Sequence, residues 1–156
     1  PYPPSEMLAH LNEHLVEVRA ENRFLALALA IFDPPSRTLI YGGAAFPWPR
    51  LVRDGKVRSI EEGGLPLGLF EDAAYSEVRV QLRPGDVVVI GSDGLEDCLL
   101  ERGDGLTQMD LDHWASRLAG RSAQDIADEL IRVTDPLAET DVRPADDRTV
   151  LVLKAV

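Results

Sequence analysis

The spacing of apolar residues alternates between a helical and a strand period along the chain, and it predicts a mixed fold. We expect Ser5 to be the N-cap of a first helix and Ser122 the N-cap of a later one. The apolar side chains of the first helix should form one buried stripe: Met7, Leu8, Leu11, Leu15 and Val18. Two later helices are predicted over residues 109–118 and 123–133.

Shorter apolar runs predict strands. Residues 87–90 form an unbroken β-branched run, which suits a strand buried on both faces. A hairpin over residues 51–60 should turn at Asp54 and Gly55. The other predicted strands cover residues 24–32, 38–41, 77–82 and 148–153.

Gly42 and Gly43 are expected to end or bulge the strand over residues 38–41. A helix, several antiparallel strands, two further helices and a return strand together indicate an α+β fold with helices packed on sheet faces. We expect residues 1–156 to form a single domain.

The charge and cysteine content of the chain limit the kinds of molecule that it can bind and the compartment that suits it. The formal net charge of -11 argues against nucleic acid, because binding the phosphate backbone requires clustered basic side chains. The same charge suits a cation or a basic protein. A single cysteine excludes an internal disulfide framework and favours the cytoplasm. No apolar stretch approaches the roughly 20 residues that span a bilayer. Because the chain starts at Pro1 without a methionine, we expect a preceding N-terminal segment.

Two acidic groups stand at the ends of apolar strands. Asp93 follows the buried run, where Gly94 would permit a sharp turn, and Asp146 and Asp147 precede the closing strand. If these strands are neighbours, Asp93 and Asp146 could meet at one end of a sheet and bind a hard divalent cation. Each group also fits a local interpretation, as a strand-ending turn and as a solvated loop.

The order of several short motifs resembles the sporulation stage II protein E type of metal-dependent serine/threonine protein phosphatase. The likeness covers nearly the whole chain, and the order and spacing of the motifs are more specific than any one of them. The residues that carry it are Leu11-Asn12, the run 24–31, Gly64-Leu65-Pro66-Leu67-Gly68-Leu69, Leu82-Arg83-Pro84-Gly85-Asp86, Ser92-Asp93-Gly94-Leu95 and Asp146-Asp147-Arg148-Thr149-Val150.

This resemblance implies an αββα sandwich of two antiparallel sheets flanked by helices, here without its N-terminal strands. It also implies two Mn²⁺ or Mg²⁺ ions that activate a water for attack on a phosphoserine or phosphothreonine. Asp93 and Asp146 match metal ligands of the family, with Asp147 as an adjoining metal-site carboxylate. Gly94 and Thr149 would support the site, Thr149 by orienting the acidic loop.

Two departures from the family pattern affect the expected activity. The first metal motif has no counterpart in these 156 residues, so we expect them to show no appreciable turnover alone. Gly43 and Phe46 stand where the family has the Asn and His of Asn-Ala-Gly-His, which removes two polar groups. A degenerate phosphatase-like domain is therefore the alternative to an active enzyme.

The two hypotheses differ in partner. As an enzyme, the protein would dephosphorylate a phosphoprotein such as an anti-sigma-factor antagonist. As an adaptor, it would be the output domain of a response regulator and bind a sigma-factor-control protein. In either case, missing strands would leave an exposed edge, so we also expect pairing with a second copy.

Two further patterns suggest other chemistry. His10, Glu13 and His14 match the H-x-x-E-H arrangement of some zinc peptidases, but the sequence indicates no third ligand. Cys98 and His113 could suggest a thiol nucleophile, although no orienting Asn or Asp is indicated by spacing. We expect Cys98 to be an ordinary buried cysteine.

Overall fold

The computed structural model describes residues 2–18, 24–100, 109–138 and 147–156, and these fall into two compact units. Unit 1 comprises residues up to 48 and residues 61–82, and unit 2 comprises residues 49–60 and 83–156. Each unit contains an antiparallel sheet with helix packed on it, which confirms the predicted α+β class with two antiparallel sheets. The single domain expected over residues 1–156 stays a prediction.

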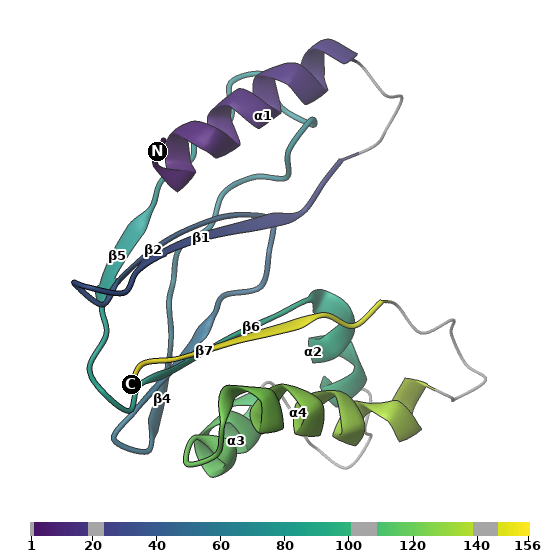
Figure 1. Cartoon of the computed structure of the whole chain (residues 1–156). Coiled ribbons are helices and arrows are strands. Elements are labelled where there is room, and N and C mark those ends of the chain that lie inside the picture. Colours follow the sequence, from purple (N-terminus) through teal and green to yellow (C-terminus); the bar gives the residue numbers. More distant parts are fainter. Residues whose placement is uncertain (1, 19–23, 101–108, 139–146) are drawn as a thin grey trace. The chain divides into compact units, whose positions relative to one another are not determined.

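Unit 1 is built on a three-stranded sheet with the order β1-β2-β5. The strands are β1 (Leu27–Asp33), β2 (Thr38–Ala44) and β5 (Val78–Gln81), and the helix α1 (Pro4–Val18) packs on β1 and β2 (Figure 1). A small apolar core of Leu8, Ala44 and Leu67 joins the helix, the sheet and the loop before β5. The predicted first strand begins three residues late, because Leu25 instead pairs with Leu67 in an isolated bridge.

The buried face of α1 differs from the predicted stripe. Leu8 and Asn12 are buried, whereas Met7 and Leu11 are each 38% exposed and Val18 is more so. Asn12 is buried because its side chain donates to the carbonyl of Phe70 at 2.8 Å and accepts from the N–H of Gly68 at 2.9 Å. These bonds satisfy the polar amide and fix the loop beneath the helix.

The predicted N-cap of α1 is also wrong. The helix begins at Pro4, and Ser5 lies inside the first turn. Both its N–H and its hydroxyl donate to the carboxylate of Glu77. A long-range partner has therefore replaced the local capping role that the sequence suggested.

The glycines of β2 neither end nor bulge that strand. The register continues through Gly42 and Gly43 up to the pair Leu27–Ala44. A Cβ at Gly42 would lie 3.1 Å from the Cβ of Pro4, so this glycine allows α1 to pack directly on the strand.

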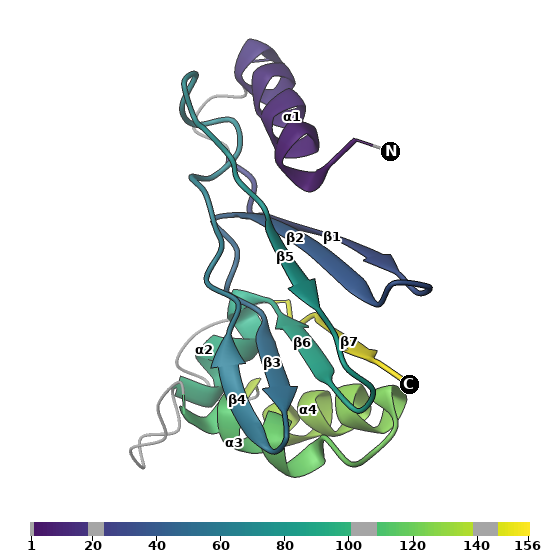
Figure 2. The ribbon, with the colours of Figure 1, turned by 90° about the vertical axis from the view of Figure 1, so that its left-hand side faces the viewer.

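Unit 2 contains a four-stranded sheet with the order β4-β3-β6-β7. Figure 2 shows the strands, which are β3 (Arg50–Arg53), β4 (Lys56–Ser59), β6 (Val87–Gly91) and β7 (Val150–Lys154). The β3–β4 hairpin turns at Asp54 and Gly55 as predicted, and both residues have positive φ. All five residues of β6 are buried, as its β-branched run predicts.

Three helices pack on one face of this sheet: α2 (Asp93–Leu100), α3 (Met109–Leu118) and α4 (Ala123–Ala138). Their apolar side chains form the main core with alternate residues of the strands, namely Val52, Val87, Val89, Leu95, Leu111, Ala115, Leu118, Ile126 and Leu130. Ser122 caps α4 as predicted, since its hydroxyl accepts from the N–H of Asp125 at 3.1 Å. No helix in the described part of the chain is long and apolar enough to cross a bilayer.

The helix α2 was not predicted. The sequence suggested a sharp turn at Asp93 and Gly94, whereas both residues belong to the first turn of this helix. Gly94 has no positive φ, so it is not used as a turn residue here. The helix forms because Leu95 and Cys98, one turn apart, are buried in unit 2. That stabilisation comes from tertiary packing rather than from local propensity.

Candidate functional site

The two acidic segments lie at the same end of the unit 2 sheet. β6 and β7 are antiparallel neighbours, and Gly91 at the end of β6 pairs with Val150 at the start of β7. The two strands are therefore neighbours, which is the condition under which the two acidic segments could meet. Asp93 therefore follows β6 at the sheet end where Asp147 approaches β7. Asp146 lies outside the described residues.

Ser92 joins the two segments through three hydrogen bonds. Its hydroxyl accepts from the N–H of Thr149 at 2.9 Å and donates to the carbonyl of Asp147 at 3.2 Å. Its own N–H donates to the carbonyl of Thr149 at 2.9 Å. Ser92 is only 9% exposed, so these bonds replace water that the polar groups have lost. We call this arrangement the Ser92 clasp.

The carboxylates beside the clasp face solvent. Asp93 and Asp147 are both exposed, and Asp93 Oδ1 accepts from the N–H of Gly94 at 2.9 Å. As the first residue of α2, Asp93 places negative charge at the positive end of the helix dipole. Thr149 contributes its backbone N–H and carbonyl to the clasp.

The donor type of this site fits a hard divalent cation. Carboxylate oxygens are the ligands that Mg²⁺ and Mn²⁺ prefer, and the exposed residues Asp93 and Asp147 supply two carboxylates at this end of the sheet. Within the described ranges, however, no group of three or more His, Cys, Asp and Glu side chains is placed to hold a metal ion. These residues would therefore provide part of a coordination shell that is completed by water and by other ligands.

A buried arginine of the same sheet, with two carboxylate partners, was missed by the sequence analysis. Arg50 is 1% exposed, and it pairs through Nη2 with Glu96 at 3.1 Å and through Nε with Asp112 at 2.9 Å. Burial raises the pKa of Glu96, although the adjacent Arg50 lowers it. The only feature of the sequence that could have indicated this burial is that Arg50 directly precedes the apolar pair Leu51 and Val52.

Gly43, where the resemblance would place an asparagine, has a structural reason to be glycine in unit 1. A Cβ at Gly43 would lie 2.9 Å from the hydroxyl of Tyr41, so a side chain there requires that hydroxyl to move. Tyr41 is fully buried, and burial, with a smaller contribution from Glu62, raises its pKa to about 12. The departure at Gly43 thus goes together with a buried tyrosine.

The histidines of α1 and Cys98 were the other candidate residues. His10 lies 3.4 Å from Glu13 and His14 lies 3.7 Å from Glu17, and all four side chains are well exposed on α1. Cys98 is 8% exposed, which confirms the prediction of a buried cysteine.

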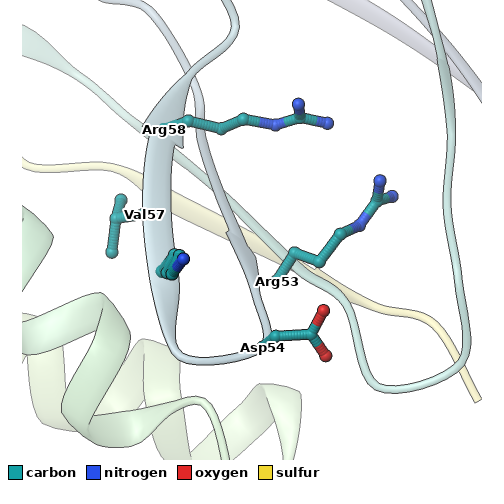
Figure 3. A pocket seen from close by; sticks show the side chains of 5 residues that line it. Arg53, Asp54, Val57 and Arg58 are labelled. Atoms are coloured by element: carbon teal, nitrogen blue, oxygen red, sulfur yellow. The ribbon is translucent and has the colours of Figure 1, made fainter.

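A cavity of about 240 Å³ lies beside the β3–β4 hairpin and is lined by Arg53, Asp54, Lys56, Val57 and Arg58. Figure 3 shows the arginine side chains of Arg53 and Arg58 extending to the same side of the hairpin, away from Val57. Arg53 is already paired with Asp86, at the start of β6. The cavity is therefore at the end of the sheet opposite Asp93, and it does not belong to the acidic site.

The sequence is similar to that of a curated bacterial phosphatase. Phosphoserine phosphatase RsbU of Bacillus subtilis (strain 168) is 27% identical over 157 residues, which is 97% of this chain and 45% of RsbU. The chain thus spans about half of that relative.

Solved structures share the fold. The SiaA-PP2C domain of Pseudomonas aeruginosa superposes with a TM-score of 0.78 at 22% identity, over 97% of this chain and 61% of that one. The Mn-presoaked phosphatase domain of SpoIIE from Bacillus subtilis gives a TM-score of 0.61 at 19% identity. The match covers 99% of this chain and 76% of that one. The family model described as Stage II sporulation protein E (SpoIIE) matches residues 1–156, and this chain belongs to that family.

Proposed function

We propose that the protein is a metal-dependent phosphatase that removes phosphate from a serine or threonine of a partner protein in bacterial signalling. Membership in the SpoIIE family and the likeness to a phosphoserine phosphatase support this function. The single observation that carries it is the Ser92 clasp, because it holds Asp93 and Asp147 at the same end of two paired strands.

In this proposal, Asp93, Asp146 and Asp147 hold Mn²⁺ or Mg²⁺. Such ions, when bound, lower the pKa of a water and offset the charge that develops on the phosphoryl oxygens. The residues of the chain supply orientation. Ser92 fixes the backbone on both sides of the site, and the start of α2 directs the carboxylate of Asp93 towards solvent, where a substrate can approach. No protein nucleophile is needed.

The proposed substrate is a serine-phosphorylated protein such as an anti-sigma-factor antagonist. The relation to RsbU supports a phosphoserine substrate. The formal net charge of -11 also favours a substrate protein with a basic surface around the phosphorylated residue, since charge complementarity speeds association.

The test compares two aspartates of the same helix in the full-length protein. Hydrolysis of p-nitrophenyl phosphate and of a serine-phosphorylated antagonist protein is measured with and without Mn²⁺. Asp93→Asn should lower the Mn²⁺-dependent rate at least about 100-fold, because a ligand is lost. Asp97→Asn, a change at an exposed position four residues later in α2, is the matched control and should retain the rate. An inactive wild-type protein, or equal rates for all three proteins, would reject the proposal.

A second candidate function, that of a non-catalytic adaptor, is favoured by the sequence itself. Gly43 and Phe46 stand where the family pattern has polar residues. Such an adaptor would bind a sigma-factor-control protein without hydrolysis. Calorimetric titration of the full-length protein with Mn²⁺ separates the two functions. Tight binding at two sites supports the enzyme, whereas the absence of binding supports the adaptor.

A further inference from the structure

Arg50 is buried, and its two ion pairs connect three elements of unit 2. It starts β3 and lies on the face of the sheet that carries Val52, which is the face covered by the helices. Its ion pairs reach Glu96 on α2 and Asp112 on α3. The side chain of Arg50 is the largest fully buried one in the part of the chain that the structure describes.

Stability alone does not explain this arrangement. Taking an ion pair out of water costs free energy that its mutual attraction often fails to recover, so apolar residues of similar size would serve the core as well. Burial raises the pKa of Glu96 even though Arg50 stands beside it, which means that the ionised carboxylate is disfavoured where it lies. We therefore looked for a role of the ion pair between Arg50 and Glu96 other than stabilising the fold.

The position of Glu96 along the chain suggests that role. Glu96 follows Asp93 by three residues, and both lie in the first turn of α2. The backbone N–H of Glu96 also donates to the carbonyl of Ser92 at 3.2 Å. The Ser92 clasp fixes where α2 starts, and Leu95 anchors one face of the helix in the main core. The ion pair to Glu96 adds a further anchor, which limits the remaining rotation of the helix about its axis.

We propose that Arg50 is a positioning residue, which holds Glu96, fixes the rotation of α2 and thereby directs the carboxylate of Asp93. This inference rests on the proposed function, in which Asp93 is a metal ligand. Arg50 itself touches neither the substrate nor the ion. It acts through the helix, as residues behind metal ligands commonly do.

The experiment uses Glu96→Gln in the full-length protein, because glutamine keeps the shape of the side chain and removes its charge. Mn²⁺ affinity is measured by electron paramagnetic resonance of the free ion. We expect the dissociation constant to rise about tenfold. The matched control is Asp86→Asn, which removes a charge from another buried ion pair of the same sheet, at the end opposite Asp93. It should change Mn²⁺ affinity by less than about twofold. Equal losses in both variants would show a merely structural role and overturn the inference.

A second measurement does not depend on the ion. Amide hydrogen exchange of Asp97 and Cys98 is followed in the metal-free protein. Glu96→Gln should speed their exchange about tenfold, whereas Glu129→Gln, a change in the ion pair between Glu129 and Arg132, should not. Unchanged exchange in Glu96→Gln overturns the inference even if the protein proves to be a phosphatase. Failure of the wild type to bind Mn²⁺ or to hydrolyse phosphate rejects the proposed function instead.

Discussion

The hydroxyl of Ser92 accepts the backbone N–H of Thr149 at 2.9 Å, although the two residues are 57 positions apart in the sequence. This bond joins the segment that starts α2 to the segment that leads into β7. It therefore connects the two motifs on which the family resemblance and the proposed site both depend.

Removing this hydroxyl should destabilise the protein. In Ser92→Ala, the N–H of Thr149 loses its acceptor in a part-buried hydrogen bond, which costs about 1 kcal/mol of unfolding free energy. The Mn²⁺ affinity of the full-length protein should fall with it. Urea unfolding followed by circular dichroism measures the first effect. The control is Ser116→Ala, since Ser116 donates to the carbonyl of Gly55 from an exposed position and its loss should cost less than about 0.5 kcal/mol. Equal stability of the two variants would contradict the prediction.

The pair between Arg53 and Asp86 should make stability depend on acid pH. Burial by itself would raise the pKa of Asp86, but hydrogen bonds from Arg53 and from the N–H of Arg83, with the charges of both arginines, bring it below its ordinary value. A lowered folded-state pKa gives stability that is present above pH 3.8 and is lost as the pH falls through that lower pKa. Asp86→Asn should therefore cost about 3 kcal/mol at pH 7 and much less near pH 2.

Urea unfolding at both pH values provides the measurement for Asp86→Asn. Glu129→Gln is the control, because the pair between Glu129 and Arg132 lies at the surface and should contribute little. A loss of stability that is the same at pH 7 and pH 2 would show that the ionised carboxylate is not responsible.

Glu96 should have the opposite pH dependence. Burial raises its pKa, the charge of Arg50 lowers it, and the carboxylates of Asp112 and Asp97 raise it, with a net increase. The folded state then binds more protons than the unfolded state above pH 4.5, so this group lowers stability as the pH rises from there through the folded-state pKa. Glu96→Gln should remove that contribution. Unfolding free energies measured between pH 4 and pH 7 check this, and an unchanged slope in the variant would refute it.

The glycine at the contact between α1 and β2 should not tolerate a side chain. In Gly42→Ala, the new Cβ would meet Pro4 Cβ and the carbonyl of Ser76, each at 3.1 Å. The Cβ of Pro4 belongs to a rigid ring and the carbonyl of Ser76 to the backbone, so neither can simply rotate away. The helix α1 must therefore shift, at a cost of about 2 kcal/mol. Gly120→Ala is the matched control because its Cβ would meet nothing within 4 Å. Thermal unfolding should separate the two variants, and equal melting temperatures would rule out the close contact as the reason for glycine.

Much of the unit 2 site was predictable from local pattern. The run Val87 to Ile90 has only β-branched residues, and such residues favour a buried strand whatever surrounds them. Asp54-Gly55 between two short strands favours a tight hairpin because both residues accept positive φ. Acidic residues at the ends of two apolar strands were visible too, and the pairing of β6 with β7 brought those ends together.

What the sequence determined by itself was therefore the type and order of the main elements and the position of Asp93 after a buried strand. The tertiary structure alone decided that Asp93 starts a helix, that Ser92 binds the other acidic segment, and that Arg50 is buried. The physical reason is that local propensity acts over a few residues. The helix α2, the clasp and the ion pair of Arg50 are stabilised by partners tens of residues away, whose contacts exist only when the chain has folded.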